Sequence, residues 1–81
     1  MSKFTLPDGY WIIRVIVKEK DKDEAQQFVR CKINNGVIPS AEKTISYLAK
    51  REGYQDGTEY DIKGISAFLE DDIERFPDVM E

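Results

Sequence analysis

The sequence contains no histidine and a single cysteine, Cys31. Histidine is the commonest general base and the commonest transition-metal ligand in proteins, so its absence argues against most hydrolase templates and most zinc sites. One cysteine excludes an internal disulfide. The chain also lacks an apolar run of membrane-spanning length and an apolar signal-peptide core. We therefore expect a cytoplasmic protein.

Motifs for phosphate or calcium binding are also missing. No glycine spacing matches a phosphate-binding loop. Asp21, Asp23 and Glu24 have a spacing similar to that of a calcium loop, but the glycine and the distal glutamate of such a loop are absent. These absences lead us to expect no metal, no cofactor and no enzymatic activity.

The most apolar stretch of the chain is residues 10–18, which alternates in the manner of a β-strand. One side of this strand is wholly apolar and consists of Trp11, Ile13, Val15 and Val17. The other side still contains Ile12 and Ile16, which is typical of a strand with neighbours on both edges. We therefore predict that this strand lies at the centre of a sheet.

A second alternating stretch covers residues 26–34 and follows a short polar link, which favours an antiparallel hairpin with the first strand. Cys31 lies between Val29 and Ile33 on the apolar side of this stretch, which indicates a buried structural thiol instead of a nucleophile. Residues 34–36, Asn-Asn-Gly, are typical of a tight turn that ends the strand.

A helix is predicted over residues 41–52, because Ser40 suits its N-terminal cap and Gly53 suits its end. The apolar face expected to contact the sheet consists of Ala41, Ile45, Leu48 and Ala49. The opposite face, expected to be solvated, carries Lys43, Thr44, Tyr47 and Lys50.

Residues 58–68 allow two interpretations. The β-branched and aromatic residues favour a strand with a bulge at Gly64, whereas apolar residues from Ile65 onward recur at helical spacing. We predict a strand over residues 58–64, with an extension to residue 67 as the alternative. An acidic helix then follows and ends near residue 75, ahead of Pro77.

These elements predict one small α+β domain over residues 1–81, with residues 1–8 loose. The expected element order is β-β-α-β followed by the C-terminal acidic helix. Since the first strand is predicted to be central, we expect a small antiparallel three-stranded sheet of order 2-1-3, with a helix across one face.

The formal net charge of −4 is unevenly distributed along the chain. Residues 1–55 contain ten Lys or Arg and seven Asp or Glu, whereas residues 56–81 contain two and nine. An acidic C-terminal third disfavours phosphate groups and favours a protein partner with a basic surface. We accordingly expect that the chain does not bind a membrane and that a nucleic acid is not its main partner. We expect a monomer or a weak homodimer.

The densest acidic cluster covers residues 70–74. It is either a solvated helix face or a docking surface for a basic partner, and catalytic carboxylates there would lack a complementary base or ligand. For the docking interpretation, the charged candidates and one apolar anchor are Glu70, Asp71, Asp72, Glu74, Asp78 and Phe76.

An alternative site lies on the sheet face opposite the predicted core and consists of Arg14, Phe28, Arg30 and Lys32. Aromatic rings on a sheet can stack on bases while Arg and Lys hold phosphates, which would make the chain a small nucleic-acid-binding domain. The glycine and aromatic motif of such modules is missing. A solvated sheet face, or one covered by the C-terminal helix, is the other interpretation.

In outline, the chain resembles small proteins that bacteriophages make early in infection to disable host enzymes or defence complexes, among them phage inhibitors of bacterial RNA polymerase. The resemblance is architectural, spans most of the chain and ends in the acidic segment. Its strands and helix are residues 11–17, 28–33, 41–52 and 59–62. It implies a non-enzymatic inhibitor in the host cytoplasm that occupies the surface of a host protein of the transcription, nucleic-acid-processing or defence machinery.

Overall fold

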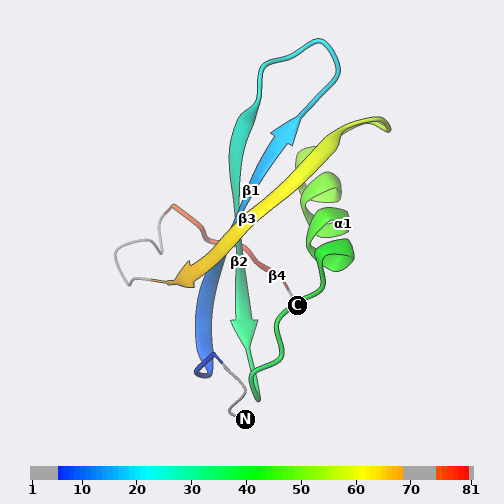
Figure 1. Ribbon diagram of the computed structural model, residues 1–81. Coiled ribbons are helices and arrows are strands. Elements are labelled where there is room, and N and C mark those ends of the chain that lie inside the picture. The colour runs from blue at the N-terminus through cyan, green and yellow to red at the C-terminus, as the bar shows by residue number, and fades with distance from the viewer. Residues whose placement is uncertain (1–5, 69–74, 81) are drawn as a thin grey trace.

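The computed structural model describes residues 6–68 and 75–80 of the chain. These residues form an α+β fold with a mixed four-stranded sheet of order β3-β1-β2-β4 and one helix (Figure 1). The elements are β1 (Gly9–Lys18), β2 (Ala25–Ile33), α1 (Ala41–Glu52), β3 (Glu59–Ala67) and β4 (Val79–Met80). β4 runs parallel to β2, and the other pairs are antiparallel.

β1 is the central strand, as predicted, with β2 on one side and β3 on the other. Its register places Ile13 opposite Val29 in β2 and opposite Ile65 in β3. The buried core cluster consists of Leu6, Ile13, Val15, Val17, Val29, Cys31, Ile33, Leu48 and Met80. The alternation of residues 10–18 therefore predicted the buried face correctly, with Trp11 partly buried at its end.

The turn after β2 has the conformation that its sequence favours. Asn35 and Gly36 have φ angles of 58° and 73°, and the Val37 N–H donates to the Asn34 carbonyl at 3.2 Å. Two successive positive φ angles in a tight turn are typical of type I′ geometry, for which Asn-Gly is preferred. The turn predicted at residues 34–36 is thus confirmed.

The N-terminal segment is less loose than predicted. Leu6 belongs to the core, and the Trp11 Nε1–H donates to the Pro7 carbonyl at 3.0 Å. The Asp8 carboxylate accepts a hydrogen bond of 2.8 Å from the Asn35 N–H. Residues 6–8 are therefore held against the hairpin, and residues 1–5 lie outside the described residues.

α1 begins and ends where its capping residues predict. The Ser40 Oγ accepts a hydrogen bond of 3.1 Å from the Lys43 N–H, and Gly53 is left-handed with φ 71°. Its N–H donates to the Ala49 carbonyl, which closes the last turn. Within residues 6–68 and 75–80, no helix has the length and apolar character required to cross a membrane.

The face of α1 that contacts the sheet matches the predicted one at Leu48 but also includes Thr44 and Tyr47, which were predicted to be solvated. Thr44 and Leu48 are fully buried, whereas Ala41 is exposed. The Thr44 Oγ1–H donates to the Ser40 carbonyl at 2.9 Å, so the hydroxyl is satisfied without water. The Arg51 Nη1–H donates to the Phe28 carbonyl of β2 at 3.1 Å, which turns the same side of the helix toward the sheet.

β3 continues to Ala67, which confirms the alternative of a strand extended to residue 67 and makes a helix that starts at residue 65 wrong. Residues 65–67 pair with β1, and this pairing decides their conformation despite the helical spacing of their apolar side chains. The irregularity predicted at Gly64 is confirmed, because Gly64 pairs with Arg14 and Ile62 with Val15, which leaves Lys63 as an extra residue.

The rest of the predicted C-terminal helix has a mixed outcome. Residues 69–74 lie outside the described residues, and Arg75 lies in a turn. Val79 and Met80 then pair with Arg30 and Cys31 as β4, a short strand that the sequence did not predict. The sheet is therefore mixed and four-stranded instead of antiparallel and three-stranded, although the predicted order 2-1-3 is retained within it.

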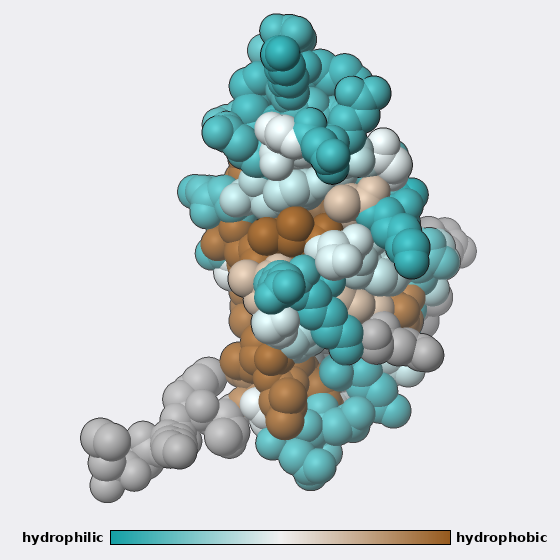
Figure 2. Space-filling model, turned by 90° about the vertical axis from the view of Figure 1, so that its right-hand side faces the viewer, coloured by the Kyte–Doolittle hydropathy of each residue, from teal (hydrophilic) through white to brown (hydrophobic). Residues whose placement is uncertain are grey.

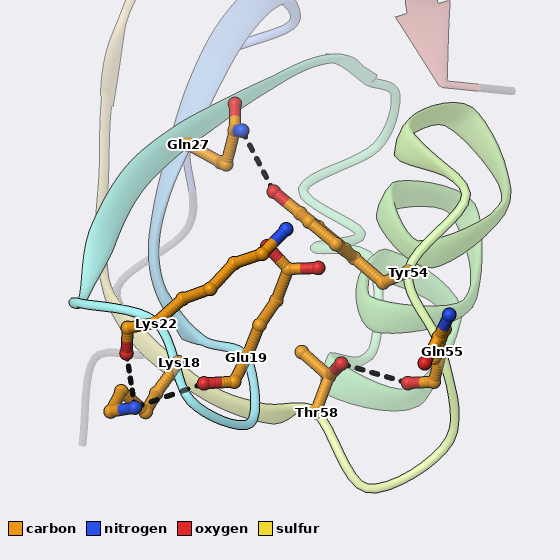
Figure 3. A network of polar contacts seen from close by, with 7 residues as sticks. All are labelled: Lys18, Glu19, Lys22, Gln27, Tyr54, Gln55 and Thr58. Carbon is orange, nitrogen blue, oxygen red and sulfur yellow. Dashed lines mark hydrogen bonds and ion pairs between the residues drawn. The ribbon is translucent and has the colours of Figure 1, made fainter.

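Hydrogen bonds fix the connection between α1 and β3 to the hairpin (Figure 3). The Gln27 Nε2–H of β2 donates to the Tyr54 hydroxyl at 2.8 Å. The Thr58 Oγ1–H donates to the Gln55 carbonyl at 2.7 Å, and the Lys18 ammonium donates to the carbonyls of Glu19 and Lys22. The bond between Gln27 and Tyr54 thus joins the connection to β2, whereas the start of β3 lies beside the end of β1 through strand pairing.

Candidate functional site

The sheet face opposite α1 is closed by a cluster around Arg30. The Arg30 guanidinium carbon lies 4.3 Å from the ring centroid of Tyr10 and 4.2 Å from that of Phe68. Its Nη1–H donates to the Phe76 carbonyl at 3.2 Å, and the Phe76 ring lies 5.3 Å from the Phe28 ring. Arg30 therefore links β1, β2, the residue after β3 and the segment before β4.

The four residues of the alternative nucleic-acid site lie on this face, as predicted. Arg14 pairs with Phe28, and Lys32 pairs with Tyr10. Arg14 and Lys32 are exposed, but Arg30 and Phe28 are half-buried in the contacts of the cluster. Half of the proposed phosphate and base contacts are thus engaged within the protein.

The acidic candidates lie mainly beyond the described residues. Glu70, Asp71, Asp72 and Glu74 belong to segment 69–74, of which the structure describes nothing. Asp78 is exposed, and Phe76 is half-buried against Phe28. Phe68 precedes the segment and Phe76 follows it, and both contact Arg30 of β2.

An apolar groove lies between β3 and the start of α1. Its volume is about 140 Å³, and it is lined by Ile13, Ile38, Pro39, Thr44, Ile62, Gly64 and Ile65. Ile38 is 51% exposed and its neighbour Val37 is 68% exposed. Apolar residues form a continuous brown band on this side of the molecule, below the hydrophilic upper end (Figure 2). The sequence signal for this surface, the apolar pair before Pro39, was not used in the prediction.

The groove adjoins the open edge of β3. The strand order puts β3 at the margin of the sheet, and no strand of the described residues pairs with its outer side. The bulge at Lys63 divides β3 into residues 59–63, which contain three charged side chains, and residues 64–67, which contain none. Gly64 and Ile65 of the uncharged half line the groove together with Ile62, the one apolar aliphatic residue of the charged half.

Two titratable groups in the fold have shifted acidities. Burial raises the pKa of the Cys31 thiol, an effect that the charge of Lys43 partly opposes. The predicted burial of this thiol is confirmed. Burial also raises the pKa of the Tyr60 phenol, with the nearby Tyr54 adding to the shift. In the part of the chain that the structure describes, no group of three or more side chains is arranged to hold a metal ion.

Comparisons with protein-family models, with curated proteins and with solved structures found no match. The function is therefore inferred from surfaces and contacts. Among the described residues, the groove beside β3 is the surface best suited to contact another molecule, because it combines exposed apolar side chains with an open strand edge.

Proposed function

We propose that this chain is a non-enzymatic protein-binding module that acts by occupying a surface of its partner. The observation that carries the proposal is the exposed apolar side chain of Ile38, which lines the groove, beside the open edge of β3. Exposed apolar residues next to an unpaired strand are typical of surfaces that bind another polypeptide.

The specific form that we propose is inhibition of a host protein in the host cytoplasm, as in the phage proteins that the chain resembles. The acidic residues of segment 69–74, together with Asp78, supply charge for a partner with a basic surface. The contacts of Phe68 and Phe76 with Arg30 support this role, because they hold the residues that flank the acidic segment against the sheet.

The test is capture of a partner from bacterial lysate by the tagged chain, at low and high salt. A charge-neutralised variant combines Glu70→Gln, Asp71→Asn, Asp72→Asn and Glu74→Gln. A matched control neutralises the exposed Glu42 of α1 with Glu42→Gln. We expect one main host protein that is retained by the control and lost in the variant and at high salt.

Apolar contact is tested in the same assay with Ile38→Asp. Because Ile38 is 51% exposed, this change removes apolar surface without opening the core. We expect reduced capture by this variant. Equal capture by all variants, or no capture by any, would contradict the proposed function.

A further inference from the structure

We propose that the open edge of β3 accepts an extended segment of the partner as an additional strand, with an aliphatic side chain in the groove and a basic side chain facing Glu59. This inference rests on the proposed protein-binding function and specifies the chemistry of the partner. It follows from the backbone of β3, the size of the groove and the charges along the strand.

The backbone of residues 64–67 is suited to pair with another strand. The Phe68 N–H donates to the Tyr10 carbonyl at 3.1 Å, so these residues form a hydrogen-bonded pair. Because such pairs alternate along an antiparallel ladder, the N–H and C=O groups of Ala67 and Ile65 point away from β1. An incoming strand would find these groups at the open edge.

The groove has the size of one side chain. Its volume of about 140 Å³ is well below the 300 Å³ or more that is typical of small-molecule sites. Its walls are mainly aliphatic, and the Thr44 hydroxyl hydrogen is already donated to the Ser40 carbonyl. An aliphatic side chain therefore fits the groove better than a polar one.

The other half of β3 determines the charge of the partner. A hollow along it is lined by Ile16, Lys18, Glu24, Glu59, Tyr60, Asp61 and Lys63. Lys63 is paired with Asp61 at 2.6 Å, and the Lys18 ammonium is bound to two carbonyl groups. Glu24 and Glu59 thus have no ion-pair partner among the residues described and favour an added Lys or Arg.

The two halves require side chains on opposite faces of the added strand. The groove opens on the α1 side, where Ile62 and Ile65 pair with buried residues of β1. Glu59 pairs with Lys18 and therefore lies on the other face. Alternation of aliphatic and basic residues meets both requirements. At about 3.3 Å per residue, the six steps from residue 59 to residue 65 span about 20 Å, so a segment of about seven residues suffices.

A second copy of this chain fits less well. Residues 59–62 of β3 read Glu-Tyr-Asp-Ile, which alternates acidic and apolar side chains. A second β3 would bring carboxylates where the edge favours ammonium or guanidinium groups, and like charges on adjacent strands are destabilising. The complement of this strand is one in which basic residues replace the acidic ones.

The experiment is selection of random peptides from a displayed library on the full chain, followed by affinity measurement of the enriched peptides. We expect enriched peptides to alternate aliphatic residues with Lys or Arg. Their affinity should fall about tenfold or more with Ile38→Asp and change less than about twofold with Val37→Asp, because Val37 does not line the groove. Glu59→Lys should weaken binding most at low salt, with Glu42→Lys as the matched control.

The backbone contact is tested separately. Ala67→Pro removes an outward N–H and should abolish binding, provided that circular dichroism matches that of the original chain. Peptides N-methylated at alternate amides test the same contact without changing the protein, and one of the two alternate methylation patterns should abolish binding.

Three results would overturn the proposed addition of an alternating aliphatic and basic partner strand while leaving the protein-binding function intact. The first is enrichment of peptides without alternation, or of peptides whose affinity is unchanged both by Ile38→Asp in the protein and by N-methylation of the peptide. The second is a captured host protein that requires only the acidic segment, with no peptide enriched. The third is a dimer in sedimentation that Ala67→Pro dissociates, which would make a second copy the occupant. Failure of both the library and the lysate capture would refute both proposals.

Discussion

The two faces of the sheet are closed by different interactions. Under α1, aliphatic side chains alternate along β1 and β2 and are almost fully buried. On the opposite face, Ile12 is buried, and Arg30 fills the space between the rings of Tyr10 and Phe68. The first face depends on burial of apolar surface, and the second on directional contacts of one guanidinium group. The comparison predicts that the two faces respond differently to substitution.

The largest effect is expected on the α1 face. Leu48→Ala removes a fully buried side chain and should lower the free energy of unfolding by about 3 kcal/mol, because the loss of burial is accompanied by a cavity. Urea denaturation measures the change, and the exposed Lys50→Ala is the control. A loss below about 1 kcal/mol would contradict the assignment of Leu48 to the core.

A smaller effect is expected on the Arg30 face. Arg30→Leu keeps apolar volume but removes two ring contacts and the hydrogen bond to the Phe76 carbonyl, which should cost about 1–2 kcal/mol in urea denaturation. Arg30→Lys should recover only part of this loss, since an ammonium group lacks the broad guanidinium surface that contacts both rings. Equal stability of Arg30→Leu and the original chain would show that the guanidinium does not hold this face together.

The two faces also differ in how well they can be predicted from the sequence. Local signals placed the hairpin, the turn at residues 34–36 and the caps of α1 correctly, because each depends on neighbouring residues. The alternation of β1 likewise predicted the face under α1. The face around Arg30 depends on Phe68 and Phe76, which are distant in sequence, and no local pattern encodes these contacts.

The errors of prediction have the same origin. Helical spacing from Ile65 onward is real, but pairing of residues 65–67 with β1 decides their conformation. β4 exists through its pairing with β2 and has only two residues. The groove combines Ile38 from a loop with Ile65 from β3, so it appears only in the folded chain. The acidic candidates of segment 69–74 remain a sequence prediction.

A still smaller effect is expected from the pH dependence of the α1 face. Burial raises the pKa of Cys31 above its ordinary value of 9.0, so the folded chain retains the thiol proton longer than the unfolded chain. Stability from this group is complete below pH 9 and is lost as the pH rises above it. As the pH rises above this value, the free energy of unfolding from urea denaturation should therefore decrease less for Cys31→Ala than for the original chain. Identical dependence of this free energy on pH in the two proteins would contradict the burial effect.

The smallest effect is expected for nucleic acid. Because Arg30 and Phe28 are engaged on the second face, a single-stranded oligonucleotide at low salt should bind too weakly to measure by fluorescence anisotropy. Lys32→Glu should leave this result unchanged. Binding that Arg30→Glu weakens would instead support the nucleic-acid alternative and require the second face to open.

The central claim, that a partner strand adds to β3, is tested most directly by amide hydrogen exchange measured by NMR, with and without the captured partner or an enriched peptide. The account predicts that the amides of Ile65 and Ala67 exchange rapidly in the free chain and at least about tenfold more slowly in the complex. The Phe68 amide is already bonded to Tyr10 and should change little, which makes it an internal control. Unchanged exchange at Ile65 and Ala67, with protection confined to other segments, would contradict the claim.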